Sequence, residues 1–504
     1  MTNMEILRNK LELSVNDITN ALKCYYEFFK SANTYRGERF RETLTSWLIY
    51  SMKVEYLKGD TAPEVNWEKL EKDDVHIKFL KETAYVVVAR ILFTRLVEDK
   101  APEVLDGSTI ISGKGMANWL EIRGYSFSYP FIKNYEDMLD AMKSIYGKLF
   151  ERNVFFDWWL NGRDVPSTCN EGMNDALCKT FLRLNEVKFE SLERDILKDI
   201  YQRLFPPDER KELGEFYTPE PIVRYILDSV GWREDADIRG KKLLDPACGS
   251  GTFLVEATRR LIRSYEQAGI LDESPEEVKQ VIKAIIDSIY GIDINPFAVF
   301  LSTINMVFQL LDLYLKVKKR DKAYTLPRIR IYCSDALLDE PPQTKLEQYT
   351  HNDSVSLAIE ELEEAKKLKE LLGKEGVDFI VGNPPYIRID NVEHSLREAY
   401  KKKYVEEEGI ARGKWDVSIF FLWRGLRWLK KNGYLGLIIS NKFNVLDMAT
   451  PLREKLKEFL REGRYGIERF VDLSGVEVFD QSLPSPCIII VKRLNDGGAC
   501  SDEN

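Results

Sequence analysis

The sequence contains few of the residues that build metal sites and acid–base relays. Among its 504 residues there are three histidines, His76, His351 and His394, and none has a sequence neighbour that suggests a ligand or a catalytic base. The seven cysteines are scattered and show no metal-binding spacing. We therefore expect no bound metal, no structural disulfide and a reduced, cytoplasmic environment.

Signals for membrane insertion and secretion are also missing. No apolar run approaches the length of a membrane span. The N-terminal residues lead directly into a polar, helix-like pattern and do not resemble a signal peptide. We expect no membrane association.

A net positive charge is absent as well. The formal charge is −9 at pH 7, so binding to nucleic acid would require a local basic surface. The best candidate is a run that contains Arg388, Arg397, Lys401, Lys402, Lys403, Arg412 and Lys414. Three consecutive glutamates, 406–408, lie in the same run, so a solvated loop explains it equally well.

Residues 1 to about 200 show mostly helical patterns. Apolar residues recur at helical spacing from Leu80 to Leu96 and again from Phe181 to Leu204, as in core-forming helices. The glycines between Gly107 and Gly115 do not have the spacing of a phosphate-binding loop. We predict a helical domain over 1–200, a second domain over 201–493 with a helical insertion at about 340–376, and a polar tail over 494–504.

Strands and helices alternate in the second domain. Three short apolar segments end in the carboxylates Asp245, Asp293 and Asp335. The first is followed by Gly249-Ser250-Gly251, where glycines let a ligand approach the backbone at a helix N-terminus. Because ligands of open α/β sheets bind at the carboxyl ends of strands, we expect the carboxylates to converge. The pattern predicts a doubly wound α/β sheet preceded by a mostly helical domain.

A fourth apolar segment ends in the turn Asn383-Pro384-Pro385-Tyr386. The prolines have no N–H, so the turn presents carbonyl oxygens and the Asn383 amide. An exocyclic amine on a base is a poor nucleophile, because its lone pair is delocalised into the ring. The Asn383 side-chain oxygen and the Pro384 carbonyl would hold its hydrogens and stabilise the charge that grows on nitrogen during alkylation. With Tyr386 stacking on the base, these three are the predicted catalytic residues.

These motifs resemble the gamma-class N6-adenine DNA methyltransferases, especially those of type IIG enzymes, over roughly 200–493. Gly214–Pro219 resembles the first cofactor motif of that family, 245–251 its glycine loop, and 334–337 the segment with its adenine-edge acid. The turn 383–386 matches the catalytic motif without departure. The resemblance implies a Rossmann-like methyltransferase of a restriction-modification or related defence system, which methylates the N6 group of an adenine flipped out of double-stranded DNA.

The resemblance also implies that the cofactor is S-adenosylmethionine. Its binding residues would be Tyr217, Thr218, Asp245, Ala247, Gly249, Gly251, Asp293, Ile294, Asp335 and Ala336. Asp245 would lie beside the ammonium group, Asp293 would accept from the ribose hydroxyls, and Asp335 would accept from the adenine amino group. Ile294 and Pro384 would give apolar contact to the adenine ring.

By the same resemblance, Phe421 and Phe479 would wall the target-base pocket. The region that reads DNA sequence follows the second of these in the family, yet a short polar stretch follows here. We therefore expect a separate specificity subunit or a missing C-terminal recognition domain. Type IIG enzymes often carry a nuclease, but Asp175 with Glu186-Val187-Lys188 falls in a helical pattern and does not predict one.

Two alternatives remain open at this stage. Some enzymes that methylate a glutamine amide in proteins resemble the chain at the turn 383–386. The chain could also be a non-catalytic subunit that binds DNA or a partner. The motif at 214–219 and the long helical N-terminal region favour DNA methylation, and intact Asn383 and Tyr386 favour catalysis.

Overall fold

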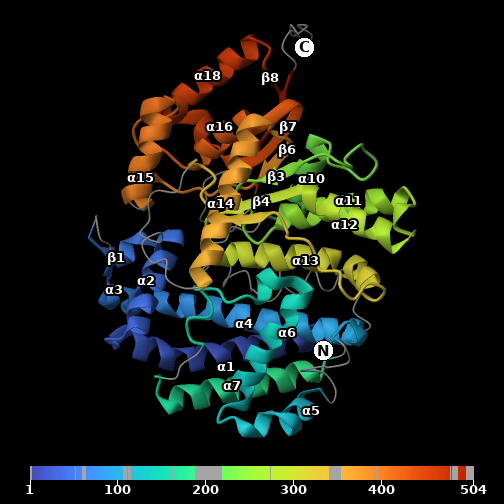
Figure 1. Cartoon of the computed structure of the whole chain (residues 1–504). Helices are drawn as coiled ribbons and strands as arrows, with labels where there is room; N and C mark the ends of the chain where they lie inside the picture. The colour runs from blue at the N-terminus through green and yellow to red at the C-terminus, as the bar shows by residue number, and fades with distance from the viewer. Residues whose placement is uncertain are drawn as a thin grey trace. The chain divides into compact units, whose positions relative to one another are not determined.

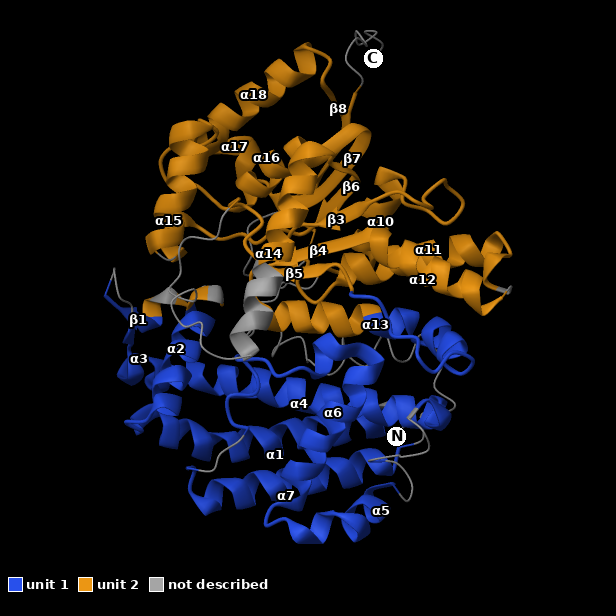
Figure 2. Ribbon diagram, in the orientation of Figure 1, with its two compact units in different colours: residues 1–48, 56–213, 307–328 blue, residues 49–55, 214–306, 329–504 orange. Residues whose placement is uncertain are grey.

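The computed structural model describes residues 3–51, 53–59, 64–105, 111, 115–160, 164–187, 218–272, 274–339, 353–392, 394–476, 478 and 486–494. The chain divides into two compact units, coloured separately in Figure 2. The first comprises residues 1–48, 56–213 and 307–328, and the second comprises residues 49–55, 214–306 and 329–504. Each unit is therefore assembled from segments that are distant in sequence.

The first unit is helical (Figure 1). Its long helices are α1 (Asn3–Ser31), α2 (Tyr35–Tyr50), α4 (Val75–Lys100), α6 (Pro130–Phe150) and α7 (Ser167–Asn185). Shorter elements are β1 (Leu57–Lys58), β2 (Glu64–Val65), α3 (Trp67–Lys72) and α5 (Gly115–Ile122). The predicted apolar stripe from Leu80 to Leu96 is buried along α4, which confirms the helical N-terminal region. The part of the second stripe beyond residue 187 lies outside the described residues.

A disulfide joins α1 to α7, so the expectation of no structural disulfide is wrong. Cys24 and Cys169 are bonded, with their Cα atoms 5.3 Å apart. The two residues are separated by 145 positions in the sequence, and α1 packs directly against α7. The spacing of cysteines in the sequence does not predict this pairing, because the packing of α1 against α7 brings the two residues together.

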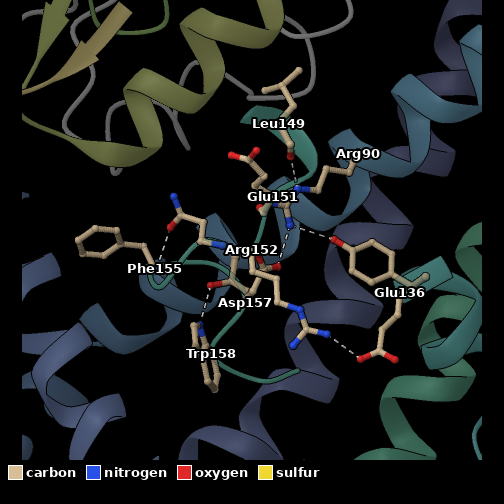
Figure 3. A network of polar contacts seen from close by, with 11 residues as sticks. Arg90, Glu136, Leu149, Glu151, Arg152, Phe155, Asp157 and Trp158 are labelled. Atoms are coloured by element: carbon tan, nitrogen blue, oxygen red, sulfur yellow. Dashed lines mark hydrogen bonds and ion pairs between the residues drawn. The ribbon is translucent and has the colours of Figure 1, made fainter. Parts of the chain in front are cut away.

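A buried arginine organises the connection that follows α6 (Figure 3). The guanidinium of Arg90 on α4 donates to Asp157 Oδ1 at 2.7 Å and to the backbone carbonyls of Leu149 and Glu151 at 2.6 and 3.1 Å. Arg90 also donates to the Tyr135 hydroxyl at 3.3 Å. A buried charge is tolerated only when it is paired and hydrogen-bonded in this way. We assign this cluster a structural role in the first unit.

The second unit is built on a mixed sheet of seven strands. The strands are β3 (Leu243–Asp245), β4 (Ile289–Asp293), β5 (Ile331–Cys333), β6 (Val377–Gly382), β7 (Leu429–Ser440), β8 (Tyr465–Asp472) and β9 (Pro486–Arg493). Their order is β5-β4-β3-β6-β7-β9-β8. The first five of these are parallel, and β9 pairs antiparallel with β7 and β8. The predicted doubly wound sheet is confirmed.

Helices cover this sheet, as Figure 1 shows. They are α10 (Glu220–Val230), α11 (Thr252–Gln267), α12 (Pro275–Ser288), the start of α13 (Pro296–Lys318), α14 (Asp353–Lys374), α15 (His394–Tyr400), α16 (Ser418–Trp428), α17 (Lys442–Val445) and α18 (Thr450–Arg461). A π-helical segment, η7 (Lys401–Glu407), continues α15. Strands β3 and β4 are apolar up to the aspartates that end them, because the inner strands of such a sheet are buried on both faces.

The segment predicted as a helical insertion contains α14. The residues Ala365, Leu368 and Leu372 of α14 are buried in the core of the second unit, and the helix packs against β5. This helix is therefore the crossover that connects β5 to β6, an integral layer of the fold. The residues 340–352 of the predicted insertion lie outside the described part of the chain.

One helix departs from the expectation that no apolar run reaches the length of a membrane span. Within the described residues, α13 is long and apolar enough to do so by length and composition. However, 83% of its most apolar window is buried inside the protein, which is what the core helix of a globular domain shows. A single helix of this kind is weak evidence for a membrane span.

Candidate functional site

The strand order places the predicted site residues along one edge of the sheet. Asp335 follows β5, Asp293 ends β4, Asp245 ends β3 and Asn383 follows β6, and these four strands are consecutive neighbours in the sheet. The chain leaves β3 toward β4 on one side and returns to β6 on the other side. The carboxyl ends of β3 and β6 therefore flank a topological switch point, where open α/β sheets bind ligands. This arrangement confirms the expected convergence of the strand ends.

The glycine turn after β3 is tied to the end of β4. The backbone N–H of Gly249 donates to Asp293 Oδ2 at 2.8 Å, and the N–H of Cys248 donates to the Ile292 carbonyl at 3.0 Å. Gly251 has a φ of +87°, and a Cβ there would lie 2.9 Å from the Cβ of Ser302. A side chain at this position would therefore clash, so only glycine allows this close approach.

Asp293 itself is held by backbone donors on both carboxylate oxygens. Its Oδ1 accepts from the N–H of Asn295 at 2.8 Å, while Oδ2 accepts from Gly249. Burial raises the pKa of Asp293, although the hydrogen bonds from Asn295, Gly249 and Ile294 act in the opposite direction. The position of its side chain is thus set by the two loops that it joins.

Asp245 lies at the switch point and is almost fully buried, with 1% exposure. Its Oδ1 accepts from the N–H of Ala247 at 3.1 Å, and a Cβ added to Gly382 would lie 2.7 Å from the same oxygen. Burial raises the pKa of Asp245 to about 8, and the nearby carboxylate of Asp293 adds to this effect. Two neighbouring acids favour the neutral form, so a cationic ligand group would be stabilised here.

The loop that carries Asp335 is held by side chains from two other elements. Asp335 Oδ1 accepts from the N–H of Leu337, and Oδ2 accepts from the Tyr400 hydroxyl at 2.7 Å. The ammonium group of Lys369, on α14, donates to Ser334 Oγ at 2.8 Å and to the Leu338 carbonyl at 2.9 Å. Burial lowers the pKa of Lys369 to about 8.

These supporting residues were not found by sequence reasoning. Tyr400 reaches an acid 65 positions away in the sequence, and no local pattern signals such a contact. Its neighbour Lys403 was considered as part of a DNA-binding surface, but it pairs with Asp339 and lies partly buried. Ala336 is buried and Ile294 is half-buried beside the same edge of the sheet.

The turn after β6 packs into the sheet. Pro384 is buried, and Asn383 and Tyr386 are half-buried. The hydroxyl of Tyr386 donates to the Ile438 carbonyl on β7 at 3.2 Å. Phe421, on α16, is 7% exposed and belongs to the hydrophobic core of the second unit. The structure therefore brings Phe421 into the same core against which Tyr386 packs.

Two of the predicted residues lie outside the described part of the chain. Tyr217 and Phe479 are not described, and only Thr218 and Pro219 of the motif 214–219 are. Thr218 is buried just before α10. The contribution of Tyr217 and Phe479 stays a prediction from the sequence.

Comparisons with known proteins find similar restriction-modification methyltransferases. A family model described as "Eco57I restriction-modification methylase" matches residues 287–479. The adenine-specific methyltransferase PglX of Streptomyces coelicolor is 27% identical over 326 residues, which are 60% of this chain and 25% of that protein. The type II restriction enzyme and methyltransferase RM.Eco57I of Escherichia coli is 23% identical over 413 residues, which are 74% of this chain and 39% of that protein.

A solved structure shares the fold. It is a nuclease-deletion mutant of the Type ISP restriction-modification enzyme LlaGI in complex with a DNA substrate mimic, with a TM-score of 0.50 at 13% identity. The similarity covers 97% of this chain and 34% of that one. The chain thus spans well under half the length of these relatives. Over residues 287–479, the chain is similar to the Eco57I family of restriction-modification methylases.

Proposed function

We propose that this chain transfers a methyl group from S-adenosylmethionine to the N6 amino group of adenine in DNA, within a restriction-modification system. One observation carries the proposal: the turn Asn383–Tyr386 follows β6 directly beside the end of β3, where Asp245 lies. The acceptor groups for an amine and the acidic end of a cofactor site thus share the switch point. The adenine specificity of the relative PglX supports the same choice of substrate.

The residues at the strand ends fit S-adenosylmethionine. The turn with Gly249 and Gly251 allows a ligand close to the backbone. The buried Asp245 and the half-buried Asp293 together favour a cation, such as the ammonium group of the cofactor. Asp335 is the third carboxylate along this edge of the sheet, and we assign it as the acceptor for the adenine amino group. When bound, the cofactor supplies an electrophilic methyl group on a sulfonium.

The chemistry of the turn depends on hydrogen-bond acceptors. Pro384 and Pro385 have no N–H, so the Asn383 side-chain oxygen and the Pro384 carbonyl are the groups presented to an amine. Both acceptors gain strength as positive charge develops on the nitrogen. The hydrogen bond from Tyr386 to Ile438 ties the phenol hydroxyl to β7. In this proposal the ring of Tyr386 stacks on the target base. Positioning therefore supplies much of the rate.

We propose further that a separate specificity subunit, or a recognition region beyond this chain, selects the DNA sequence. Direct readout requires an element that enters a groove and presents several side chains to base edges. The site as described supplies acceptors and a stacking face for one base. The larger size of the relatives agrees with additional parts for recognition.

A methylation assay tests the proposal. The purified chain is incubated with S-adenosylmethionine and unmethylated duplex DNA, and N6-methyladenine is measured by mass spectrometry of the digested DNA. Methylation by the parent, lost in Asn383→Ala, is the expected result. Methylation of glutamine in added protein, with none in DNA, would establish the other substrate class. Failure to bind the cofactor would contradict the proposal altogether.

A further inference from the structure

A group of exposed cations lies directly beyond the proposed catalytic turn. Arg388 follows Tyr386 by two residues, and the segment 387–389 pairs antiparallel with 415–417. The N–H of Ile389 donates to the Trp415 carbonyl at 3.1 Å, and the N–H of Val417 donates to the Ile387 carbonyl at 2.9 Å. Because a strand advances about 3.3 Å per residue, this ladder begins within about 7 Å of Tyr386.

A pocket of about 430 Å³ opens beside the ladder. We call it the rim pocket, and it is lined by Arg412, Gly413, Lys414, Leu446, Asp447 and Met448. Residues 412–414 precede the second strand of the ladder, and residues 446–448 follow α17. A hydrogen bond from the N–H of Arg412 to the Met448 carbonyl at 3.0 Å joins these two loops. The pocket is therefore a built feature of the second unit, with two cations and two apolar side chains on its walls.

The two cations of the rim pocket, Arg412 and Lys414, and the neighbouring Arg388 are largely exposed to solvent. The side chains of Arg388, Arg412 and Lys414 are 59%, 57% and 73% exposed. Arg388 and Lys414 share the single carboxylate of Asp390, at 3.6 and 3.2 Å. Arg412 lies 3.6 Å from the Asp447 carboxylate and donates a solvent-exposed hydrogen bond to the Asp447 carbonyl at 3.1 Å. Exposed ion pairs of this kind contribute little. Three cations thus face two carboxylates, and an anion can replace these partners at small cost.

Three other cations of the basic run have partners within the fold. Lys403 pairs with Asp339, Lys401 lies near Glu398 and Glu406, and Arg397 donates to the Val392 carbonyl at 2.9 Å. Lys403 and Arg397 thus serve contacts within the fold, whereas the ion pairs of Lys401 are exposed and Lys401 does not line the rim pocket. Arg412 and Lys414 combine high exposure with a place in the pocket, and Arg388 lies next to them through the shared Asp390, two residues beyond the catalytic turn.

We infer that the rim pocket binds the sugar–phosphate backbone of the DNA strand next to the target adenine. The inference rests on the proposed function, and it names the surface that holds the substrate. Two guanidinium groups and an ammonium group suit phosphate oxygens. Leu446 and Met448 offer apolar contact to a deoxyribose. Phosphate contacts of this type position DNA without reading its sequence, in agreement with recognition supplied elsewhere.

Salt-dependent DNA binding tests the inference. The affinity of the chain for a fluorescently labelled duplex is measured by anisotropy between about 50 and 200 mM KCl, with and without the double substitution Arg412→Gln and Lys414→Gln. The slope of log K against log salt is negative, and each lost phosphate contact reduces its magnitude by about 0.9. The slope of the double variant should therefore be smaller in magnitude by about 2. Affinity for the cofactor should not change.

Two further variants separate this effect from damage to the fold. Lys283→Gln is a matched control, because Lys283 is 70% exposed and paired with Asp287, on a helix that enters β4 at its amino end. Its slope should equal that of the parent. Asp447→Asn removes a competing carboxylate that is 93% exposed, so it should tighten DNA binding at low salt, a gain that a folding defect cannot produce.

The outcomes distinguish the inference from the proposed function. A parent chain that binds DNA with the same salt slope as the double variant would overturn the inference and leave the proposed function intact. An equal loss in Lys283→Gln would also overturn it, because the effect would then be one of overall charge. A parent that binds no duplex at low salt would contradict both.

Discussion

The hydroxyl of Tyr400 donates a hydrogen bond to Oδ2 of Asp335 over 2.7 Å. Tyr400 is buried at the end of α15, and burial, followed by the charge of Asp335, raises the pKa of its phenol well above the usual value. The tyrosine is therefore a permanent donor to the acid. The neighbouring Tyr404 hydroxyl donates to the Leu337 carbonyl at 2.5 Å, so one short segment orients the loop at the end of β5.

Tyr400→Phe should weaken binding of S-adenosylmethionine while it preserves the packing of the ring. Without the hydroxyl, Asp335 loses one of the two contacts that orient its carboxylate. We expect a loss of about 1 kcal/mol, or roughly fivefold in Kd, measured by calorimetry. Discrimination against a cofactor analogue with an oxo group in place of the adenine amino group should also shrink, because Asp335 is the proposed acceptor for that amino group.

Tyr404→Phe is the matched control for this prediction. It removes a hydroxyl from the same segment and frees a backbone carbonyl of the same loop, yet it leaves Asp335 with both of its contacts. Its effect on the preference for the amino group should be smaller. Equal loss of preference in both variants would show that Tyr400 acts only through general loosening of the loop.

Asp245→Asn should stabilise the cofactor-free protein at high pH. Burial raises the pKa of Asp245 to about 8, with Asp293 adding to the shift, and Cys248 is the other buried titratable group beside this pair. A carboxyl with a raised folded-state pKa favours folding at low pH, and this contribution is lost as pH rises toward 8. The advantage of the variant should therefore grow from pH 5 to pH 8, by at most about 1.4 kcal/mol per pH unit.

The midpoint of thermal unfolding as a function of pH measures this effect. Asp237→Asn, at an exposed loop position, should leave the pH profile of the parent unchanged. With the cofactor present the order should reverse, because the ionised Asp245 is the proposed partner of its ammonium group. A constant offset between parent and Asp245→Asn at all pH values would contradict the assignment of the raised pKa.

Asn383→Ala should reduce turnover far more than it reduces cofactor affinity. The lost acceptor gains most of its strength as the amine nitrogen becomes positive, so kcat should fall about 100-fold or more while the Kd for the cofactor stays similar. Tyr386→Phe should retain much of the activity, because it keeps the ring face and loses only the hydrogen bond to Ile438. Parental turnover in Asn383→Ala would rule out the proposed role of the turn.

Local signals in the sequence were sufficient to predict the strand ends and their chemistry. Apolar runs that stop at Asp245, Asp293 and Asn383 predicted buried strands with polar ends, and the parallel sheet brings those ends to one edge. The glycines after Asp245 likewise predicted a turn. The structure shows why glycine is needed there, because Gly251 has a positive φ that other residues rarely adopt.

Contacts between distant segments had no such signal. Such contacts depend on how helices pack. They include the hydrogen bond from Tyr400 to Asp335, the hydrogen bond from Lys369 to Ser334, and the disulfide between Cys24 and Cys169. The basic run from Arg388 to Lys414 was predicted as one surface or one loop. In the structure the run does not act as one surface. Its middle part belongs to the fold, because Lys403 pairs with Asp339 and Tyr404 is buried.

One continuous segment, residues 400–414, connects the proposed cofactor loop to the rim pocket. Tyr400, Lys403 and Tyr404 hold residues 335–339, and the same segment continues through Gly409, at a φ of +58°, to Arg412 and Lys414. The π-helical turn η7 lies between the two ends, and such turns are frequent at functional sites. Ordering of one end by a ligand should therefore favour the bound arrangement of the other.

DNA should accordingly raise the affinity for the cofactor, and the cofactor should raise the affinity for DNA by the same factor, since linkage between two binding sites is reciprocal. We expect about a fivefold change, or roughly 1 kcal/mol of coupling. Calorimetric Kd values for the cofactor with and without saturating duplex measure it. The coupling should disappear in Arg412→Gln/Lys414→Gln and persist in Lys283→Gln. A cofactor Kd that is independent of DNA in the parent would show that the segment between the sites transmits nothing.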